Sequence, residues 1–457
     1  GFAEGNTQSA GCPAGQIDVV VNGQFTGVPA CIQQNGINTA ANGLGDTQSI
    51  DPNIQSPTVI RANLGLQAGL DIASEGFFSG WNLNLDFIYS QFQNPFTLVD
   101  LAATPAINGV AGAGLNGFTI DGRPIYRSID PSVAGCTARL TSVGAPPVYS
   151  NVNLPCFNTS RDDELMLTNA DSYSSMIASF ILSKNHNRGL ITDGGSIFFS
   201  LGYSYTDSKD RRNLYNSTAG SNYDLTAAFD RQNPAASRGF YESRHNIALQ
   251  TTFTERFFGE YDTRLGFTFI ARSGRPYSLT FQGGSVFGDS VSGVDNALVY
   301  LPTGVNDPNI SPTSNATAVQ QLVDFANGLS CARRYIGRSI PRNTCTNDWY
   351  YDLDLSFSQE LPGPLSVFGV KQDSIRLYAT FDNFLNFLND SWNVQRRRNF
   401  SGLQEVIGTS GIDAQGRYII TPLSGTGVTP QSNFDADNQI NVSSSVWRLK
   451  VGVSYRF

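Results

Sequence analysis

The last segment of the chain alternates apolar and polar side chains at every second position. Its apolar set is Trp447, Leu449, Val451, Val453, Tyr455 and Phe457, and its polar set is Arg448, Lys450, Gly452, Ser454 and Arg456. Successive side chains of a β-strand point to opposite faces, so this segment predicts a strand with one apolar and one wet face. Such strands are typical of a transmembrane β-barrel, which has lipid outside and a polar lumen inside.

The same two-residue period recurs along the chain and predicts nine strands. They span residues 58–73, 78–92, 172–185, 195–208, 244–257, 262–280, 349–361, 373–387 and 441–457. The segment 172–185 is the least regular, because Met176, Ile177, Phe180 and Ile181 fall on both faces. The predicted class is therefore all-β: a transmembrane, antiparallel, up-and-down β-barrel with long extracellular loops.

Composition supports this class over a soluble or disordered chain. Charged residues are 15% of the sequence, against about 25% in ordinary globular chains. A hydrophobic fraction of 40% with 11% aromatic residues argues against disorder. No apolar run approaches the ~18 residues that a membrane-spanning helix needs. The net charge of −8 argues against a nucleic-acid partner.

Short and long connections alternate between the predicted strands. The short turns are 74–77, 186–194, 258–261 and 362–372, and the long connections are 93–171, 209–243, 281–348 and 388–440. Bacterial barrels have short periplasmic turns and long outer loops, so the long connections are predicted to be extracellular. The same alternation predicts that 1–57 is an extracellular loop and that further strands precede Gly1.

The six cysteines all fall in predicted outer segments and lie in neighbouring pairs. These are Cys12 with Cys31, Cys136 with Cys156, and Cys331 with Cys345. Extracytoplasmic space is oxidising, and cross-links constrain long loops. Local disulfides are therefore predicted, although six cysteines allow 15 pairings. Metal binding is the rival interpretation, but C-x-x-C spacing is lacking and the chain has two histidines.

Two motifs near the end carry a resemblance to a known family. Lys450, Gly452, Tyr455 and Phe457 resemble the assembly signal of outer-membrane barrels, and Asn383-Phe384-Leu385-Asn386 resembles the Asn-Leu-Phe-Asn box of TonB-dependent receptors. Four further segments resemble, in their order along the chain, the Oar-like branch of these receptors. They are Arg272-Ser273-Gly274-Arg275-Pro276-Tyr277, the stretch 295–302, a helix predicted near 316–327, and Pro341-Arg342-Asn343. The resemblance covers about residues 244–457. Residues 1–243 share with this branch only the order of a long loop, paired strands and a second long loop.

The resemblance implies a C-terminal portion of a barrel of about 22 strands in the bacterial outer membrane. The family's N-terminal plug, TonB box and regulatory-like domain are not in this chain. It implies TonB-dependent active import of a scarce ligand captured by the outer loops, with outer-membrane lipid, lipopolysaccharide, the TonB complex and a lipoprotein as partners. The alternative is a structural or adhesive barrel that presents disulfide-stapled loops; passive diffusion through an open pore is a third interpretation.

Periodicity places one set of charged side chains on the wet face. They are Asp86, Arg264, Asp352, Asp354, Arg376, Asp382, Arg448 and Lys450. In the family such residues contact the plug, so the resemblance implies that these face the lumen and the plug. The competing interpretation is that they solvate the wall or pair with one another.

Several loop residues have both a functional and an ordinary interpretation. Arg396-Arg397-Arg398 is a candidate for binding lipopolysaccharide phosphates, although a solvated charge run needs no role. Asp289, Asp295 and Asn296 carry oxygens suited to Ca²⁺, but EF-hand spacing is absent, so no cofactor is predicted. Loop aromatics are candidates for contacting a sugar or peptide, although packing within the loop is the commoner role; they are Tyr215, Tyr223, Phe229 and Tyr241.

No arrangement of residues supports catalysis, so the chain is predicted not to be an enzyme. His245 follows Arg244 at the outer end of a predicted strand, but no Ser/His/Asp order or carboxylate pair surrounds it. A hydrogen bond at the rim is the expected role of His245. Asn158 and Asn216 match the Asn-x-Ser/Thr pattern of glycosylation acceptors. In a bacterial protein this match does not indicate glycosylation.

Overall fold

The fold is described from a computed structural model of the 457-residue chain. The described residues are 20–22, 24–25, 30–31, 33–34, 47–105, 117–159, 164–288, 293–369, 373–398 and 401–457.

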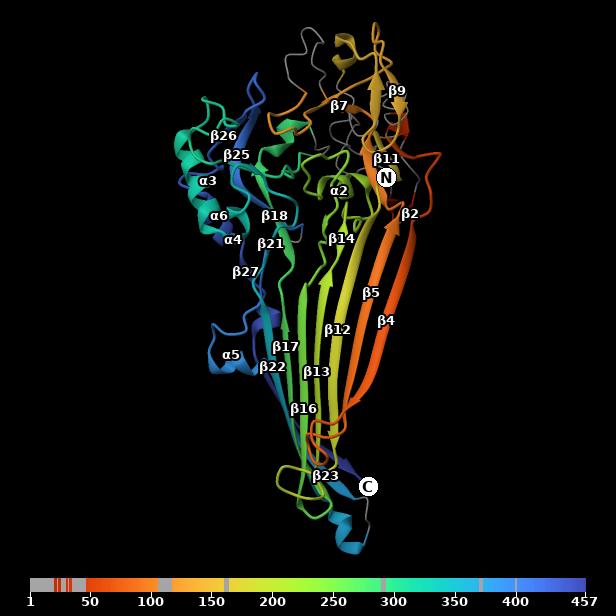
Figure 1. Ribbon diagram of the computed structural model, residues 1–457, viewed down its shortest axis with the longest axis vertical. Helices are drawn as coiled ribbons and strands as arrows, with labels where there is room; N and C mark the ends of the chain where they lie inside the picture. The colour runs from red at the N-terminus through yellow and green to blue at the C-terminus, as the bar shows by residue number, and fades with distance from the viewer. Residues whose placement is uncertain are drawn as a thin grey trace.

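Nine long strands form one antiparallel sheet in which neighbours in sequence are neighbours in space (Figure 1). The strands are β4 (Thr58–Leu70), β5 (Trp81–Gln93), β12 (Tyr173–His186), β13 (Ser196–Asp207), β16 (His245–Phe258), β17 (Tyr261–Arg272), β22 (Tyr350–Pro362), β23 (Ser374–Asp382) and β28 (Arg448–Arg456). Each of the nine predicted segments therefore contains a strand of this sheet, in the up-and-down order that the alternating connections predicted.

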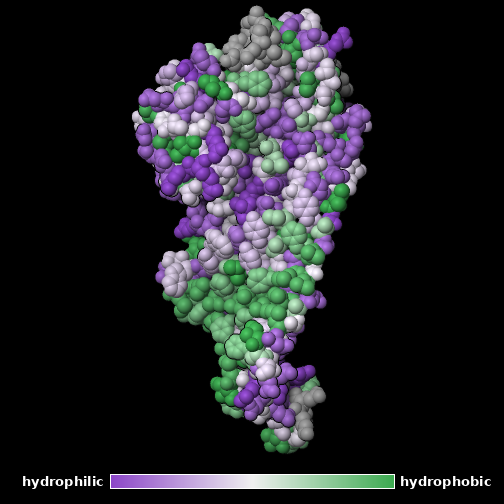
Figure 2. Space-filling model, in the orientation of Figure 1, coloured by the Kyte–Doolittle hydropathy of each residue, from purple (hydrophilic) through white to green (hydrophobic). Residues whose placement is uncertain are grey.

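The cross-strand register sorts the side chains onto two faces. Apolar residues lie opposite apolar residues across six strands; this row is Leu85, Phe180, Tyr203, Ile247, Ala271 and Tyr351. The row next to it on the other face is polar: Asp86, Ser179, Ser204, Asn246 and Arg272. Figure 2 shows the apolar side chains gathered in a band over the lower part of the strands, beneath a mainly hydrophilic head.

The sheet ends in two strands, β4 and β28, that have a sheet partner on one side only among the described residues. No closed barrel is formed by this part of the chain. Val451 in β28 is 75% exposed and Leu64 in β4 is 73% exposed. No helix among the described residues is long and apolar enough to cross a membrane.

The described residues of the four long connections fold together into a head at one end of the sheet (Figure 1). These connections run between the strands over 94–172, 208–244, 273–349 and 383–447. The described residues of the short turns 71–80, 187–195, 259–260 and 363–373 lie at the other end together with the C-terminus. The first connection contributes β6 (Phe96–Asp100) and β11 (Glu164–Asn169), which form a small sheet with β3 (Thr47–Ile50). Residues 47–50, from the predicted outer segment 1–57, thus belong to the head.

A second sheet joins the third and fourth connections. Its order is β21 (Cys345–Thr346), β18 (Pro276–Gln282), β25 (Leu403–Ile412) and β26 (Tyr418–Thr421), and β18 runs parallel to β25. Helix α3 (Ala316–Gly328) was predicted near 316–327. Its buried face, which includes Leu322 and Phe325, packs into the same core. The Asn315 side chain caps this helix by accepting a hydrogen bond from the Ala318 amide at 3.0 Å.

Three predicted strand boundaries were wrong, each for a local reason. The segment 262–280 is two strands, because β17 ends at Arg272 and β18 leaves the main sheet to pair with β21 and β25. The segment 373–387 ends as a strand at Asp382, because Asn383 adopts a left-handed φ of 55° and caps helix α5 (Phe384–Leu388). The segment 441–457 begins with the short helix α7 (Val442–Ser445).

Two of the predicted cysteine pairs are disulfides. Cys136 is bonded to Cys156, and Cys331 is bonded to Cys345. The first lies in the first connection, and the second fastens the start of α4 (Ser330–Arg333) to β21. The predicted pair of Cys12 with Cys31 includes Cys12, which lies outside the described residues.

Gly452, one residue of the predicted assembly signal, has a packing role at the last strand pair. A Cβ atom at this position would lie 2.3 Å from Cζ of Tyr378, the residue opposite it on β23. The Tyr378 ring therefore lies directly over the glycine, where any side chain would displace it.

We expect Gly452→Ala to destabilise the pairing of β23 with β28 by about 1–3 kcal/mol through overpacking, measured by equilibrium unfolding of the full-length protein. Gly69→Ala is the matched control, because a Cβ at Gly69 in β4 meets nothing within 4 Å. Equal stability of the two variants would contradict this role of Gly452.

Candidate functional site

The charged residues predicted for the wet face all lie on one face of the sheet. The register places Asp86, Arg264, Asp352, Asp354, Arg376, Asp382, Arg448 and Lys450 on the face opposite to the apolar band. The face is not uniformly polar, since Ile177 and Ile181 of β12 share it. This arrangement gives the sheet the two-faced character that the alternation predicted.

Most of these charges have partners within the sheet. Arg264 binds Asp262 at 2.7 Å, Arg376 binds Glu360, and Lys450 binds Asp382 at 3.0 Å. Arg448 donates to the carbonyl of Ser443 at 2.9 Å. Pairing along the wall therefore uses much of the hydrogen-bonding capacity of this face.

Asp352 and Asp354 organise the junction between the sheet and the last connection. Asp354 accepts a hydrogen bond from the Asn383 amide at 2.8 Å, and Asp352 accepts one from the Asn393 side chain at 3.3 Å. The Asn383 side chain also donates to the carbonyl of Ser445 at 2.6 Å. The Asn-Phe-Leu-Asn segment thus anchors the start of the fourth connection to β22 and to the residues before β28.

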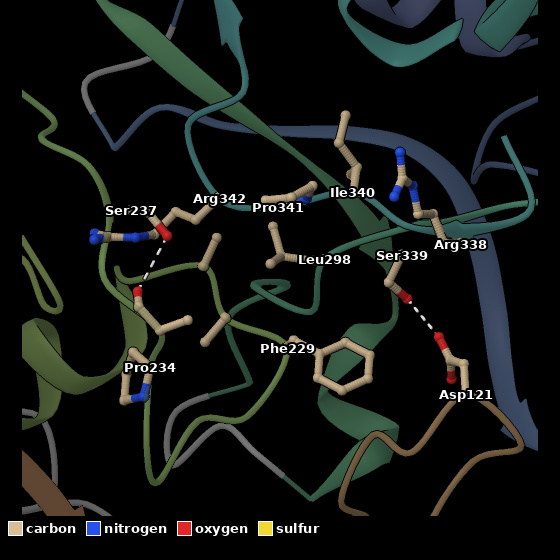
Figure 3. A pocket seen from close by; sticks show the side chains of 13 residues that line it. Asp121, Phe229, Pro234, Ser237, Leu298, Arg338, Ser339, Ile340, Pro341 and Arg342 are labelled. Atoms are coloured by element: carbon tan, nitrogen blue, oxygen red, sulfur yellow. Dashed lines mark hydrogen bonds between the residues drawn. The ribbon is translucent and has the colours of Figure 1, made fainter. Parts of the chain in front are cut away.

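The head contains a partly enclosed cavity of about 350 Å³ where three long connections meet (Figure 3). The first connection supplies Asp121, the second supplies residues 227–229, 234, 235 and 237, and the third supplies Leu298 and residues 338–342. Its wall is mainly apolar, with the buried side chains Ala227, Ala228, Leu298 and Ile340 beside Phe229 and Pro341. This volume lies at the lower end of the range of ligand pockets, about 300–1,000 Å³.

Polar groups occupy opposite ends of the cavity. Asp121 lies at one end, where its carboxylate accepts hydrogen bonds from the hydroxyls of Thr119 (2.5 Å), Ser339 (2.8 Å) and Tyr418 (2.9 Å). Arg342 and Ser237 lie at the other end (Figure 3). Burial raises the pKa of Tyr418 to about 12, with Arg123 opposing the rise and Asp121 adding to it, so its hydroxyl remains a donor to Asp121.

Arg123, in the first connection, lies behind the cavity wall and contacts the other three long connections. Its guanidinium carbon is 5.1–5.9 Å from the centres of four aromatic rings, which belong to Phe229, Phe281, Phe287 and Tyr418. Its Nη2 donates to the carbonyl of Leu298 and lies 3.5 Å from the Ser339 hydroxyl. The side chain is fully buried, so these cation–π contacts are of the desolvated, stronger kind.

A second basic cluster lies between the small sheet and the second connection. Arg212 and Arg231 both stack on Tyr223, with their guanidinium carbons 4.8 and 5.0 Å from the ring centre. Burial, with the charge of Arg231 as a further cause, lowers the pKa of Arg212 to about 9. Arg212 donates to Thr97 and to the carbonyls of Tyr223 and Arg231, so it stabilises the head.

Other sequence candidates have structural surroundings that narrow their roles. Arg396 and Arg397 are exposed in β24, but Arg398 is buried over the Phe434 ring and binds Gln404. The interpretation of 396–398 as one solvated run was therefore wrong for Arg398, because an aromatic ring covers its guanidinium group. His245 shares a hydrogen bond of 2.9 Å with the Tyr203 hydroxyl and stacks on Trp349.

The loop aromatics and the Ca²⁺ candidates also have specific positions. Phe229 lines the cavity and Tyr223 is buried between two arginines, whereas Tyr215 and Tyr241 pack around Phe240. Asn296 is buried and donates to the carbonyl of Asp224, and Asp289 lies outside the described residues. Within the described ranges no group of three or more His, Cys, Asp or Glu residues could hold a metal ion.

The sequence did not predict the cavity or the buried position of Arg123. It also did not predict that Arg342 lines the cavity. Their sequence neighbourhoods carry no motif for binding, and the cavity lining comes from residues separated by more than a hundred positions. Comparisons of this chain with protein-family models, with curated proteins and with solved structures give no match.

We expect Arg123→Ala to loosen the head, because the substitution removes the side-chain contacts that join the first connection to the other three and leaves the Leu298 carbonyl unpaired. The expected loss is about 3 kcal/mol of stability, read as faster proteolysis and hydrogen exchange in the connections while the main sheet stays protected. Arg334→Ala, at an exposed position in the same head, is the control and should leave both rates unchanged. Unchanged protection in Arg123→Ala would show that Arg123 does not hold the connections together.

Proposed function

We propose that this chain forms part of the wall and the extracellular head of a bacterial outer-membrane β-barrel. Its role is the capture of a scarce ligand for TonB-dependent import. The observation that carries the proposal is the combination of a two-faced antiparallel sheet with four long connections gathered at one end of it. In this proposal the apolar band faces lipid and the charged face lines the lumen.

The lipid environment accounts for features that are costly in water. The apolar face leaves many large side chains exposed, and contiguous apolar patches of this kind mark membrane or protein contact. In hydrocarbon each backbone group needs a partner, so β4 and β28 would pair with further strands to close the wall. About 22 strands in the closed barrel is the expectation from the family resemblance.

The head supports ligand capture over a simple anchor. Its three converging connections build a cavity, and a cross-linked, buried core holds them in place. A plug in the lumen, opened by TonB from the periplasm, is the part of the proposal that the resemblance supplies. The chain would catalyse no reaction, and its selectivity would reside in the head.

The membrane assignment predicts opposite outcomes for one substitution on the two faces of β17. Leu265 lies on the apolar face and is 39% exposed, and Thr268 lies on the polar face opposite Asp354. Leu265→Lys should lower the stability of the membrane-folded protein by about 2–4 kcal/mol, whereas Thr268→Lys should be tolerated. Folding into lipid vesicles, followed by urea titration, measures the difference. Equal tolerance of both lysines would favour a water-soluble sheet.

Active import predicts that uptake depends on TonB. Cells that express the full-length protein, with and without TonB, would be compared for accumulation of a labelled panel of peptides, oligosaccharides and siderophores. We expect at least one class to accumulate only with TonB. Uptake that is equal in both strains would contradict active import and favour an open pore, and surface binding without any uptake would favour an adhesive role.

A further inference from the structure

A cluster of aromatic rings stands out from the apolar face where the sheet meets the fourth connection. Neighbouring rings lie 5.0–6.0 Å apart between centres, and they belong to Phe381, Phe384, Phe387 and Trp447. Phe381 pairs with Leu449 in the apolar register, and Phe387 and Trp447 are 50% and 42% exposed. Figure 1 shows α5, which carries Phe384 and Phe387, beside the sheet below the head, and Figure 2 shows the apolar band reaching this level. The cluster thus lies at the upper edge of the band, the position that aromatic side chains take at a membrane–water interface.

Side-chain amides fix the backbone that carries this aromatic cluster. The Asn386 side chain donates to the carbonyls of Asp390 and Trp392, each at 3.0 Å. The Asn383 side chain caps α5 and donates to the carbonyl of Ser445. The rings therefore form a preformed apolar surface, which loses little conformational entropy when a hydrocarbon chain packs on it.

A two-stranded ribbon joins the aromatic cluster to the head. It consists of β24 (Arg396–Arg397) and β27 (Gln439–Ile440), and Figure 1 shows β27 between α5 and the lobe that contains α3, α4 and α6 (Pro430–Ala436). The ribbon starts at Gln395, whose carbonyl accepts a hydrogen bond from the Asn441 amide at 2.8 Å. A strand advances about 3.3 Å per residue, so the two arginines lie within about 3–7 Å of that bond along the ribbon. The headgroup layer on each side of a bilayer is about 5–8 Å thick, so an aromatic cluster at the hydrocarbon edge would place the arginines among the headgroups.

The two sides of the ribbon differ in character. Arg396 lies opposite Ile440, which is 46% exposed, so one side combines a cation with apolar surface. Arg397 lies opposite Gln439, so the other side is polar. The side of Arg396 is the one that suits a membrane surface, because an arginine can lay its stem on apolar surface and keep its guanidinium group among polar headgroups.

The ribbon carries positive charge that the protein does not pair. Neither Arg396 nor Arg397 forms an ion pair with an acidic residue among the described residues. Arg396 donates to the carbonyl of Asn438 at 3.4 Å, which uses one of its several donors. Asp437, next to β27 in sequence, lines a hollow of the head with Glu405. Because a guanidinium group matches a phosphate group with parallel hydrogen bonds, a phosphate-bearing headgroup complements Arg396.

We propose that the aromatic cluster and the ribbon form a docking surface for an outer-leaflet lipid with an uncapped phosphate in its headgroup. Arg396 binds the phosphate, the acyl chains pack on the aromatic cluster, and Arg397 adds to the positive potential. Continuity with the apolar band and the unpaired charge of Arg396 favour a lipid over a protein partner. The inference rests on the membrane position in the proposed function, and it names the lipid chemistry that the outer rim of the wall binds.

Native mass spectrometry of the purified full-length protein tests the proposal without transport. The protein in neutral detergent is mixed with equimolar phosphatidic acid and phosphatidylcholine that have the same acyl chains, and the bound lipids are counted. We expect at least about tenfold more phosphatidic acid than phosphatidylcholine to stay bound, because its phosphate is not capped by choline and accepts charge-assisted hydrogen bonds. Equal retention of the two lipids would overturn the proposal. Displacement of phosphatidic acid by equimolar inorganic phosphate would also overturn it, since the site would then bind a free anion.

The two neighbouring arginines provide matched variants. Arg396→Gln should lower the preference for phosphatidic acid at least about fivefold, as expected for loss of an ionic partner. Arg397→Gln removes the same charge from the opposite side of the same strand and should keep most of the preference. Phe387→Ala should lower the retention of both lipids alike, because it removes contact with acyl chains and not with the phosphate. A preference that survives Arg396→Gln, or that both arginine variants reduce equally, would contradict the role of Arg396.

The outcome is separable from that of the membrane proposal. If Leu265→Lys destabilises the membrane-folded protein as predicted and the two lipids are retained equally, the lipid site alone is refuted. If both lysines on β17 are tolerated equally and phosphatidic acid is still preferred, the membrane position is refuted and the phosphate site stands.

Discussion

The whole structure depends on the register between neighbouring strands. A strand repeats every two residues, so a shift of one residue would exchange its two faces. Across the nine strands the register keeps Leu, Ile, Val and aromatic side chains opposite one another, and it keeps charged and hydroxyl side chains opposite one another on the reverse face. One mainly apolar face and one mainly polar face follow from this single condition. The up-and-down order of the strands places the long connections at the same end.

The head solves a different physical problem, because long connections lose much conformational entropy when they become ordered. The second and third connections meet the first around the cavity, and the third joins the fourth through the parallel pair of β18 with β25. Arg123 adds a buried cation whose four aromatic neighbours come from the second, third and fourth connections. The two disulfides shorten free segments of the first and third connections. These contacts make a cavity in a loop region a defined feature of the fold.

The alternation of side chains was enough to predict the nine strands, because a half-buried face forces a period of two wherever a strand runs. It was not enough at strand ends. The left-handed conformation of Asn383 ends β23 inside a stretch that still alternates, and β18 continues the pattern of β17 while pairing with other strands. The polar wall was also predictable by residue, since Arg264, Asp352 and Lys450 fall in the polar phase. The cavity was not, because Asp121, Phe229 and Arg342 converge only through the tertiary fold. Arg398 is buried for the same reason, since its neighbour Phe434 is distant in sequence.

The most direct test of the account is a nitroxide scan through residues 449–455 of the full-length protein in lipid vesicles, with one spin label per variant. Collisions with oxygen, which partitions into lipid, and with a polar nickel complex report which medium each label faces. Gly452 is left unlabelled, because a side chain there would displace Tyr378. The account predicts a period of two, with labels at 449, 451, 453 and 455 accessible to oxygen and labels at 450 and 454 accessible to the nickel complex. If all six labels were equally accessible to the nickel complex, the apolar face would lie in water and the membrane-barrel account would be wrong.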